Sequence, residues 1–473
     1  FNCTLVWVSC QFEQDKKVKL RHKKCQFTTL LDIGRGVYND NMKYYLAVDI
    51  GASSGRHIVG YRGADGKIQL DEVYRFPNGM KQSDDGLVWD VEALFAEVKN
   101  GLRAAIAGYG EICSMAIDTW GVDYVLMRGK QSVLPCFAYR NERTADDIDE
   151  VHKLVPFAEL YRRTGIQFQT FNTVYQLYDD KVHGRLAGVT DFLMMPQYLA
   201  YRLTGEMLHE YTDATTGGLV NAASGQYDEE LIAALGLPEQ IFKPLSKPGT
   251  VVGQLTDDVA AEVGGQTTVV LCASHDTASA YEAVDCDENS VVLSSGTWSL
   301  IGAKLPQANT SEASLTANFS NEGGVGYFRY LKNIMGMWLI NEVRRKKNVA
   351  ITDIVATAES SKYTQTFDVN DESLMAPSDM ETAIRRLLAD NPPQNDGDLY
   401  ASIYRSLALS YGNAVCEMEK ILGKTFDKIY IVGGGAKNKF LNVLTEQYTG
   451  KQVVALPIEA TALGNILLQM RRD

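Results

Sequence analysis

The chain has 473 residues, of which 45% are hydrophobic and 22% are charged, a balance typical of a soluble globular protein. This length predicts two domains, and no apolar run approaches the ~20 residues of a membrane span. The formal net charge is −13 and the body of the chain has no basic run, which argues against a nucleic-acid partner.

The first 41 residues differ from the rest. They contain the basic segment CQFEQDKKVKLRHKKC, and the chain opens with Phe1 rather than Met. A secretory signal would place its positive charge before an apolar core, which is not the order here. We therefore expect residues 1–41 to be a disordered or non-native leader outside the fold, with Met42 as the natural start. A basic arm for nucleic acid is the alternative.

Eight cysteines are scattered along the chain and none forms a Cys-x-x-Cys pair. This usage predicts reduced thiols in a cytoplasmic enzyme.

The first half of the body alternates strand and helix patterns. Residues 44–50 and 57–62 read as strands on either side of a loop of small residues, and residues 90–109 have the apolar spacing of a helix. Residues 112–127 read as a buried strand, a polar interruption and a second strand. A helix follows that ends at Gly205, and residues 267–284 read as a strand running into a helix.

The second half repeats this pattern. Residues 290–303 again read as strand, small polar loop and strand, and residues 426–450 as strand, Gly-rich turn and helix. The echo predicts two related α/β domains with a cleft between them. We expect the first domain over residues 42–287 and the second over residues 288–473, with the boundary near 285–289.

Three small-residue loops are candidates for binding phosphate. The amides of the loop at 51–55 can form an anion-binding concavity, Arg56 could add charge, and Asp49 could hold Mg²⁺ through water. An ordinary hairpin turn is the alternative. SSGTWS at 294–299 occupies the matching place in the second half, and VGGGAKN at 432–438 joins a strand to a helix.

The stretch ASHDTASA offers a candidate general base. Ser274, His275 and Asp276 resemble a hydrolase triad, but adjacent side chains on a strand end are expected to point apart. Asp276 alone, at a strand-to-helix joint, could accept the proton of an attacking hydroxyl, or it could simply cap the helix. In DTWGVD, the face of Trp120 could pack on a sugar, or the residues could form a β-bulge with a core Trp.

Together these motifs resemble the FGGY family of carbohydrate kinases, within the actin/hexokinase-like (ribonuclease H-like) superfamily. The resemblance runs from about residue 43 to the end of the chain. The motifs that carry it occur in the family's order: AVDIGASSGR, IDTWGVDYVLM, AYRNERT, YRRTGIQFQTFNTVYQL, YRLTGE, ASHDTASA, LSSGTWSLIG, NEGGVGYFRYLKNIMGMWL, VGGGAKN and IEATALGNI.

The resemblance implies a role for particular residues. Asp276 matches the family's proton acceptor, and Asn341 stands where the family has a Gln that contacts ATP. The positions that match ATP-binding residues are Ala52, Ser53, Ser54, Gly55, Arg56, Thr297, Asn341 and Gly434. The positions that match sugar-binding residues are Gly121, His275, Asp276, Thr277 and Asn333.

The resemblance also implies an activity. Within the family, GASSGR, DTWGVD and LKNIMG match the members that phosphorylate L-rhamnulose at C1 with ATP and Mg²⁺, in L-rhamnose catabolism. Another ketose such as L-fuculose or L-xylulose is one alternative, and a sugar-sensing regulator on the same fold is another. Members of the family usually continue with a further C-terminal helical segment, which leaves open whether the second domain is complete. The sequence does not decide between a monomer and a homodimer.

Overall fold

The structure, a computed structural model, describes residues 42–375, 377–456 and 459–472. The leader predicted over residues 1–41 lies outside these ranges. Within them, no helix is both long and apolar enough to cross a lipid bilayer.

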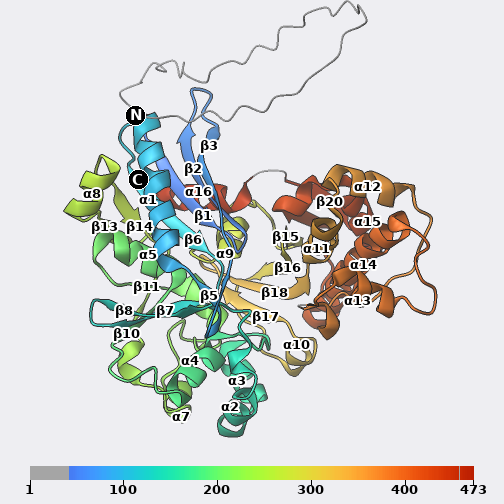
Figure 1. Ribbon diagram of the computed structural model, residues 1–473, viewed down its shortest axis with the longest axis horizontal. Helices are drawn as coiled ribbons and strands as arrows, with labels where there is room; N and C mark the ends of the chain where they lie inside the picture. The colour runs from blue at the N-terminus through green and yellow to red at the C-terminus, as the bar shows by residue number, and fades with distance from the viewer. Residues whose placement is uncertain (1–41, 376, 457–458, 473) are drawn as a thin grey trace, which may run out of the picture. The chain divides into compact units, whose positions relative to one another are not determined.

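A six-stranded mixed sheet organises the first half of the chain, in the order β13-β14-β6-β1-β2-β3 (Figure 1). The central strand β1 is buried along its whole length, and it pairs antiparallel with β2 and parallel with β6. Such a strand needs no alternation of polar and apolar residues. The strands are β1 (Tyr45–Ile50), β2 (Ser54–Arg62), β3 (Ile68–Pro77), β6 (Ser114–Thr119), β13 (Val251–Gln254) and β14 (Thr268–Val270).

Helices cover this sheet, and two of them confirm predicted boundaries. Helix α1 (Val91–Tyr109) begins after Asp90, whose carboxylate accepts a hydrogen bond from the amide of Ala93, as an N-cap does. Helix α5 (Met195–Thr204) ends at Gly205, which adopts the left-handed conformation common at helix ends. The sheet also packs against α8 (Asp257–Val263), α9 (Asp276–Glu282) and α16 (Ala460–Arg472).

Helix α16 comes last in the described chain yet packs on the first sheet (Figure 1). The side chain of Gln469 donates to the carbonyl of Leu46 in β1 at 3.0 Å, and that of Asn465 donates to Asp118 in β6 at 2.6 Å. Helix α16 therefore helps to position β1 and β6, and with β1 the start of the β1–β2 loop.

A second six-stranded sheet, in the order β17-β18-β16-β15-β19-β20, organises the second half. Strand β15 pairs antiparallel with β16 and parallel with β19, as β1 does with β2 and β6. This confirms the predicted echo between the halves. The strands are β15 (Ser290–Ser295), β16 (Trp298–Leu305), β17 (Ser320–Gly323), β18 (Phe328–Met335), β19 (Lys428–Val432) and β20 (Gln452–Ala455).

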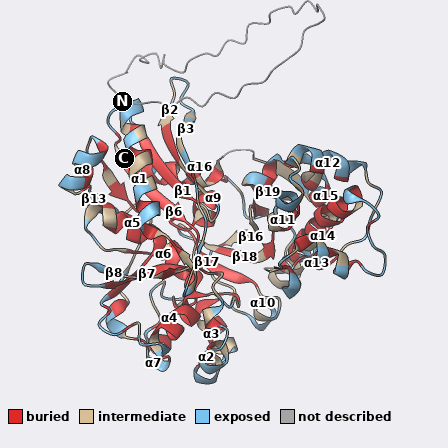
Figure 2. Cartoon of the chain, viewed as in Figure 1, coloured by how far each residue is buried: buried red, intermediate tan, exposed pale blue. Residues whose placement is uncertain are grey.

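Helices pack against the second sheet and close its core. Buried residues gather in the strands of both sheets and on the inner faces of these helices (Figure 2). The helices are α10 (Glu312–Thr316), α11 (Trp338–Lys347), α12 (Ile351–Ser360), α13 (Met380–Leu387), α14 (Asp396–Leu422) and α15 (Lys439–Thr449), with 3₁₀ turns η4 (Glu372–Leu374) and η5 (Gly434–Lys437).

Smaller elements of the first half complete the fold. The strands β7, β8 and β10 form one small sheet, β4, β5 and β9 another, and β11 and β12 a third. These strands are β4 (Lys81–Ser83), β5 (Gly86–Trp89), β7 (Tyr124–Arg128), β8 (Gln131–Val133), β9 (Cys136–Phe137), β10 (Asp191–Met194), β11 (His209–Glu210) and β12 (Leu245–Ser246). The helical pieces are η1 (Glu142–Thr144), α2 (Ile148–Leu154), α3 (Phe157–Thr164), α4 (Thr173–Val182), α6 (Tyr211–Ala214), η2 (Thr215–Gly217), α7 (Glu229–Ala234) and η3 (Glu239–Ile241).

Candidate active site

A cavity of about 420 Å³ is lined by residues of both halves, a volume within the usual range of small-molecule sites. The first half contributes the β1–β2 loop, the segment after β6 and the start of α9. The second half contributes the β15–β16 loop, β17, β18 and the turn after β19. Among the sequence-predicted site residues, the cavity is lined by Asp49, Ala52, Ser53, Ser54, Arg56, Gly121, His275, Asp276, Thr277, Thr297, Asn333 and Gly434.

Two predicted residues lie elsewhere. Gly55 does not line this cavity, and a Cβ added there would meet the ring of Phe76 at 2.1 Å, so a glycine lets β2 pack against that ring. Asn341 is exposed on α11 and also lies outside the cavity lining.

The β1–β2 loop is braced from outside the hairpin. Asn78 uses its side-chain amide to donate to the carbonyl of Gly51 at 2.8 Å and its backbone amide to donate to that of Ser53 at 3.1 Å. Because the loop joins two antiparallel strands, its amides reach the cavity from a hairpin rather than from the start of a helix.

The loops of the second half lie against one another. Gly433 has φ +81°, and a Cβ on Gly435 would meet the Oγ of Ser295 at 2.0 Å. A Cβ on Gly434 would meet no heavy atom within 4 Å. The run of glycines therefore lets the turn after β19 approach the β15–β16 loop while leaving open space beside the backbone of Gly434, which suits a bulky planar or charged ligand.

Asp276 faces the cavity rather than capping the helix. Helix α9 begins at Asp276, its N-cap residue is His275, and no side chain caps it. The side chain of Asp276 is 32% exposed, and its Oδ1 accepts a hydrogen bond from the hydroxyl of Thr277 at 3.0 Å. The alternative that Asp276 is an N-cap is therefore wrong.

The expectation that neighbouring side chains here point apart is also wrong for one pair. The Nε2 of His275 lies 3.5 Å from the Oδ1 of Asp276, because the chain turns from strand to helix between them. Ser274 is not part of the series, since its hydroxyl donates to the carbonyl of Cys272 at 3.3 Å. No hydrolase-like triad forms from these three residues.

Arg56 is held by two carboxylates at the rim of the cavity. Its Nε and Nη2 donate to the Oδ2 of Asp49 at 2.9 and 2.7 Å, and its Nη1 contacts Glu459. Burial raises the pKa of Asp49, and the attraction of Arg56 only partly opposes it. Burial would lower the pKa of Arg56, but Asp49 and Glu459 raise it overall. The guanidinium therefore stays charged beside the first phosphate loop.

Asp118 lies beside Asp49 on the neighbouring strand and is fully buried. Its Oδ2 accepts from Asn465, but its Oδ1 has no hydrogen-bond partner among the described residues. Burial, and then repulsion from Asp49, raise the pKa of Asp118 well above its ordinary value. A buried carboxylate oxygen without a partner is the kind of oxygen ligand that a hydrated divalent cation accepts.

In the DTWGVD segment the structure bears out the core position predicted for Trp120, while its contact with a sugar stays a prediction. Trp120 is only 7% exposed and belongs to the core, yet it also lines the cavity. Its indole donates to the Oδ2 of Asp123 at 2.9 Å, and burial raises the pKa of Asp123 to about 6. Val122 adopts φ +69°, an uncommon conformation for a β-branched residue, and its amide donates to the hydroxyl of Thr216.

Several lining residues were not predicted from the sequence. Gln167 and Phe171 come from the segment between α3 and α4, and Glu322 comes from β17. The side-chain oxygen of Gln167 accepts a hydrogen bond from the amide of Asn333 at 3.1 Å, which ties the two halves together at the cavity wall. No local spacing marks these residues, since only the packing of distant segments brings them to the cavity.

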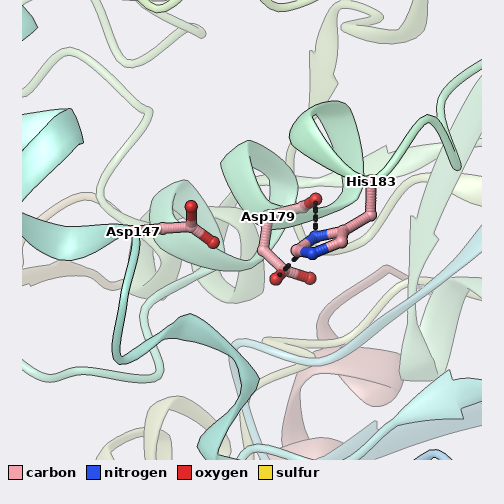
Figure 3. A group of neighbouring side chains, drawn as sticks. All are labelled: Asp147, Asp179 and His183. Carbon is pink, nitrogen blue, oxygen red and sulfur yellow. Dashed lines mark hydrogen bonds and ion pairs between the residues drawn. The ribbon is translucent and has the colours of Figure 1, made fainter.

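A group of potential metal ligands, Asp147, Asp179 and His183, lies outside the cavity lining (Figure 3). Their ligand atoms lie within 4.8 Å of one another. The Nδ1 of His183 is 3.1 Å from Asp179, and Arg143 also pairs with Asp179. Burial, then a hydrogen bond with Asp179, raise the pKa of Asp147. With Asp179 already shared between two basic side chains, the group acts as a brace between α2, α4 and η1.

Comparison with known proteins identifies the class. Residues 44–281 match the N-terminal domain of the FGGY family of carbohydrate kinases, and residues 291–472 match its C-terminal domain. The chain belongs to this family and is a sugar kinase.

Particular relatives and structures agree with this. A rhamnulokinase from Halalkalibacterium halodurans is 43% identical over 90% of this chain and 93% of its own, and one from Oceanobacillus iheyensis is 41% identical over 90% and 92%. The structure of a xylulose kinase from Lactobacillus acidophilus superposes with a TM-score of 0.76 at 16% identity, covering 91% of this chain and 89% of that one. A Plasmodium falciparum glycerol kinase with ADP gives 0.72 at 13% identity, covering 91% and 90%. The predicted two-domain actin/hexokinase-like fold is confirmed, and the comparisons give no support to a sugar-sensing regulator.

Proposed function

We propose that this kinase transfers the γ-phosphoryl group of ATP to the C1 hydroxyl of L-rhamnulose, giving L-rhamnulose 1-phosphate and ADP, in L-rhamnose catabolism in the cytoplasm. The observation that carries the proposal is one cavity lined by the small-residue loops β1–β2 and β15–β16 and by Asp276. The relatives named rhamnulokinase support the choice of sugar, because they share about 40% identity over 90% of the chain.

Asp276 is the proposed proton acceptor. Its carboxylate takes the proton of the C1 hydroxyl as that oxygen attacks the γ-phosphorus, and the bond from phosphorus to the β–γ bridging oxygen breaks to release ADP. Gly121, His275, Thr277 and Asn333 are the proposed sugar contacts.

The phosphates are proposed to lie between the loops of the two halves. Amides at Ala52, Ser53, Ser54 and Thr297 would donate to phosphate oxygens, and Arg56 would add a positive charge. Gly434, with open space beside it, would admit the nucleotide. Gly55 is proposed to act by letting the loop pack against Phe76. Asn341, being exposed on α11, would reach ATP only after a movement of that helix.

Mg²⁺ fits the carboxylates beside the phosphate loop. When bound, it would neutralise phosphate charge. Asp49 and Asp118 are the proposed residues that hold it through water, since the Oδ1 of Asp118 is buried without a protein partner among the described residues. The pairing of Asp49 with Arg56 leaves its Oδ1 for that purpose.

Domain roles follow the same proposal. The first domain, over residues 42–287, would bind the sugar and part of the phosphates, and the second, from residue 288 onward, would bind the nucleotide. Since water is also a hydroxyl nucleophile, the site should be completed only when the sugar binds.

The test is sugar-dependent release of ADP, measured with a coupled assay across L-rhamnulose, L-fuculose and L-xylulose. We expect the highest kcat/KM with L-rhamnulose. The variant Asp276→Asn should lose about 10²–10⁴-fold in kcat with a smaller change in sugar KM. The matched control Asp285→Asn, an exposed aspartate after α9, should behave like the unaltered enzyme. A preference for another ketose would overturn the choice of substrate, and full turnover by Asp276→Asn would overturn the choice of base.

A further inference from the structure

Two buried charged residues of the second sheet contact His275, although His275 belongs to the first half. Arg329 of β18 has 0% exposure, and Glu322 of β17 has 4%. The Nη1 of Arg329 lies 3.0 Å from the Oε2 of Glu322 and 3.1 Å from the Nδ1 of His275. The same Oε2 lies 3.3 Å from that Nδ1. The guanidinium of Arg329 and the carboxylate of Glu322 thus both contact the Nδ1 of His275.

The other ring nitrogen of His275 faces the proposed base. Its Nε2 lies 3.5 Å from the Oδ1 of Asp276, a long contact of the kind that tightens in an occupied site. Thr277 donates to the same Oδ1 at 3.0 Å. Both of these contacts of the Asp276 carboxylate involve Oδ1, so Oδ2 is available to a substrate hydroxyl.

The contacts at Nδ1 restrict where the ring can carry hydrogen. If Arg329 donates to Nδ1, the neutral ring must carry its hydrogen on Nε2. If Nδ1 instead carries a hydrogen and donates to Glu322, an unprotonated Nε2 would place a lone pair against the carboxylate of Asp276. That repulsion favours protonating Nε2 as well. Either arrangement leaves a hydrogen on Nε2.

We propose that Glu322 and Arg329 are positioning residues that keep Nε2 of His275 protonated, so that His275 is always a hydrogen-bond donor and Asp276 alone accepts the sugar proton through Oδ2. The part of this inference that concerns the sugar proton rests on the proposed function. The part that concerns the hydrogen on Nε2 of His275 does not. It means that the second half of the chain sets the hydrogen-bonding state of a residue at the sugar site in the first half.

Charged and titratable groups surround this cluster. Asp276 lies on α9, Glu322 on β17 and Arg329 on β18. The buried carboxyl of Asp213 interacts electrostatically with Asp276 and Arg329, and Glu210 accepts a hydrogen bond from the amide of Ser274, the neighbour of His275. Burial acts to raise the pKa of Glu322, but Arg329 and His275 lower it below its ordinary value. Burial, and then Glu210, raise the pKa of Asp213 well above its ordinary value. The carboxylate of Glu322 therefore stays ionised beside His275.

The direct test is ¹⁵N NMR of the histidine rings in the full-length protein without sugar, with the His275 signals assigned from their loss in His275→Gln. We expect Nε2 to carry a hydrogen between pH 6.5 and 8, as either the neutral or the charged ring. A neutral ring with hydrogen only on Nδ1 would overturn the proposal. This measurement needs no substrate, so it stands or falls separately from the choice of L-rhamnulose.

Kinetics of two pairs of variants give a second test, with the preferred sugar from the ketose panel. Glu322→Gln should lower kcat by about tenfold or more with a smaller change in sugar KM. The control Glu381→Gln, a half-buried glutamate on α13 that pairs with Lys347 and Arg385 and lies outside the cavity lining, should not. His275→Gln, which keeps a donor near the place of Nε2, should retain more kcat than His275→Asn, whose donor lies near the place of Nδ1.

Three outcomes would contradict the kinetic expectation. They are a folded Glu322→Gln with unchanged kcat, an equal loss in Glu381→Gln, and a higher kcat in His275→Asn than in His275→Gln. If Glu322→Gln does not fold, the histidine pair and the NMR measurement still decide the matter.

Discussion

Arg56 and His57 are neighbours on β2, and their side chains lie on opposite faces of the strand, as the alternation of a β-strand requires. Arg56 lines the cavity, whereas His57 is fully buried in the core. The Nε2 of His57 is 3.2 Å from the carbonyl of Val98, and its Nδ1 has no partner among the described residues. A Cβ on Gly101 would collide with this ring, so α1 packs directly on it.

We predict that His57 makes the free energy of unfolding depend on pH. Burial lowers its pKa from 6.5 to about 4, so between these values the unfolded chain binds more protons than the folded one. Above pH 6.5 the His57 ring therefore does not lower the free energy of unfolding. As the pH is lowered toward 4, that free energy falls by about 3 kcal/mol in all because of His57. Urea unfolding at several pH values measures it.

The matched variant is His57→Phe, which keeps a ring but cannot titrate. Its free energy of unfolding should change less between pH 6.5 and 4.5 than that of the unaltered protein. Asp123, whose pKa is raised to about 6, acts with the opposite sign in both proteins and cancels in the comparison. Equal pH dependence in the two proteins would contradict the prediction.

At the scale of elements, the contact between α9 and α16 positions the proposed base. Helix α9 begins with Asp276, and α16 crosses it closely at Gly464. A Cβ on Gly464 would lie 1.7 Å from the carbonyl oxygen of Ser279 and 3.1 Å from the Cβ of Glu282. Backbone atoms cannot move aside cheaply, so the helices would have to separate.

Gly464→Ala should therefore lower the free energy of unfolding by about 1–3 kcal/mol, the usual cost of overpacking. It should also lower kcat at temperatures where the protein is still folded, because α9 would shift. The control is Gly108→Ala in α1, where a Cβ would meet no heavy atom within 4 Å. That change should stabilise the protein slightly, by up to ~1 kcal/mol. Similar stability of the two variants would contradict this view of the crossing.

Local patterns in the sequence predicted individual elements well. The spacing of apolar residues gave α1, and the Gly-rich and small polar loops marked the ends of β1, β15 and β19. They did not predict that α16 packs on β1, because that contact joins opposite ends of the described chain. They also missed Glu322 and Arg329, since two charged residues in short strands give no signal until packing buries them against His275.

The family and the fold were predicted through the order of many motifs rather than through any one of them, and the roles of the site residues stay predictions. Asp276 alone was equally consistent with a helix cap, and only its place in the cavity separates the two interpretations. Asn341 shows the limit of transferring residues by position, because here it lies exposed on α11. Side-chain states such as the ring of His275 depend on atoms from both halves, which no sequence pattern specifies.

At the scale of the whole molecule, Arg140 joins the two halves beside the β15–β16 loop. It comes from the first half, and its guanidinium lies over the rings of Trp338 at 4.8 Å and Trp298 at 5.7 Å, both from the second half. Its Nη1 also donates to the carbonyl of Met375 at 3.2 Å. Because Trp298 directly follows Thr297, this contact fixes the loop proposed to bind phosphate.

We predict that Arg140→Met raises the KM for ATP by about 2- to 30-fold, the range expected for losing a cation–π contact of this kind. Arg140→Lys should resemble Arg140→Met, because an ammonium group cannot both stack on two indoles and reach the carbonyl. The control is Arg103→Met, which removes an exposed arginine that pairs with Glu262 and is not part of the cavity lining. Hydrogen exchange of residues 294–299 should be faster in the Arg140 variants alone. An unchanged KM for ATP together with unchanged exchange in Arg140→Met would show that the two halves hold this loop without Arg140.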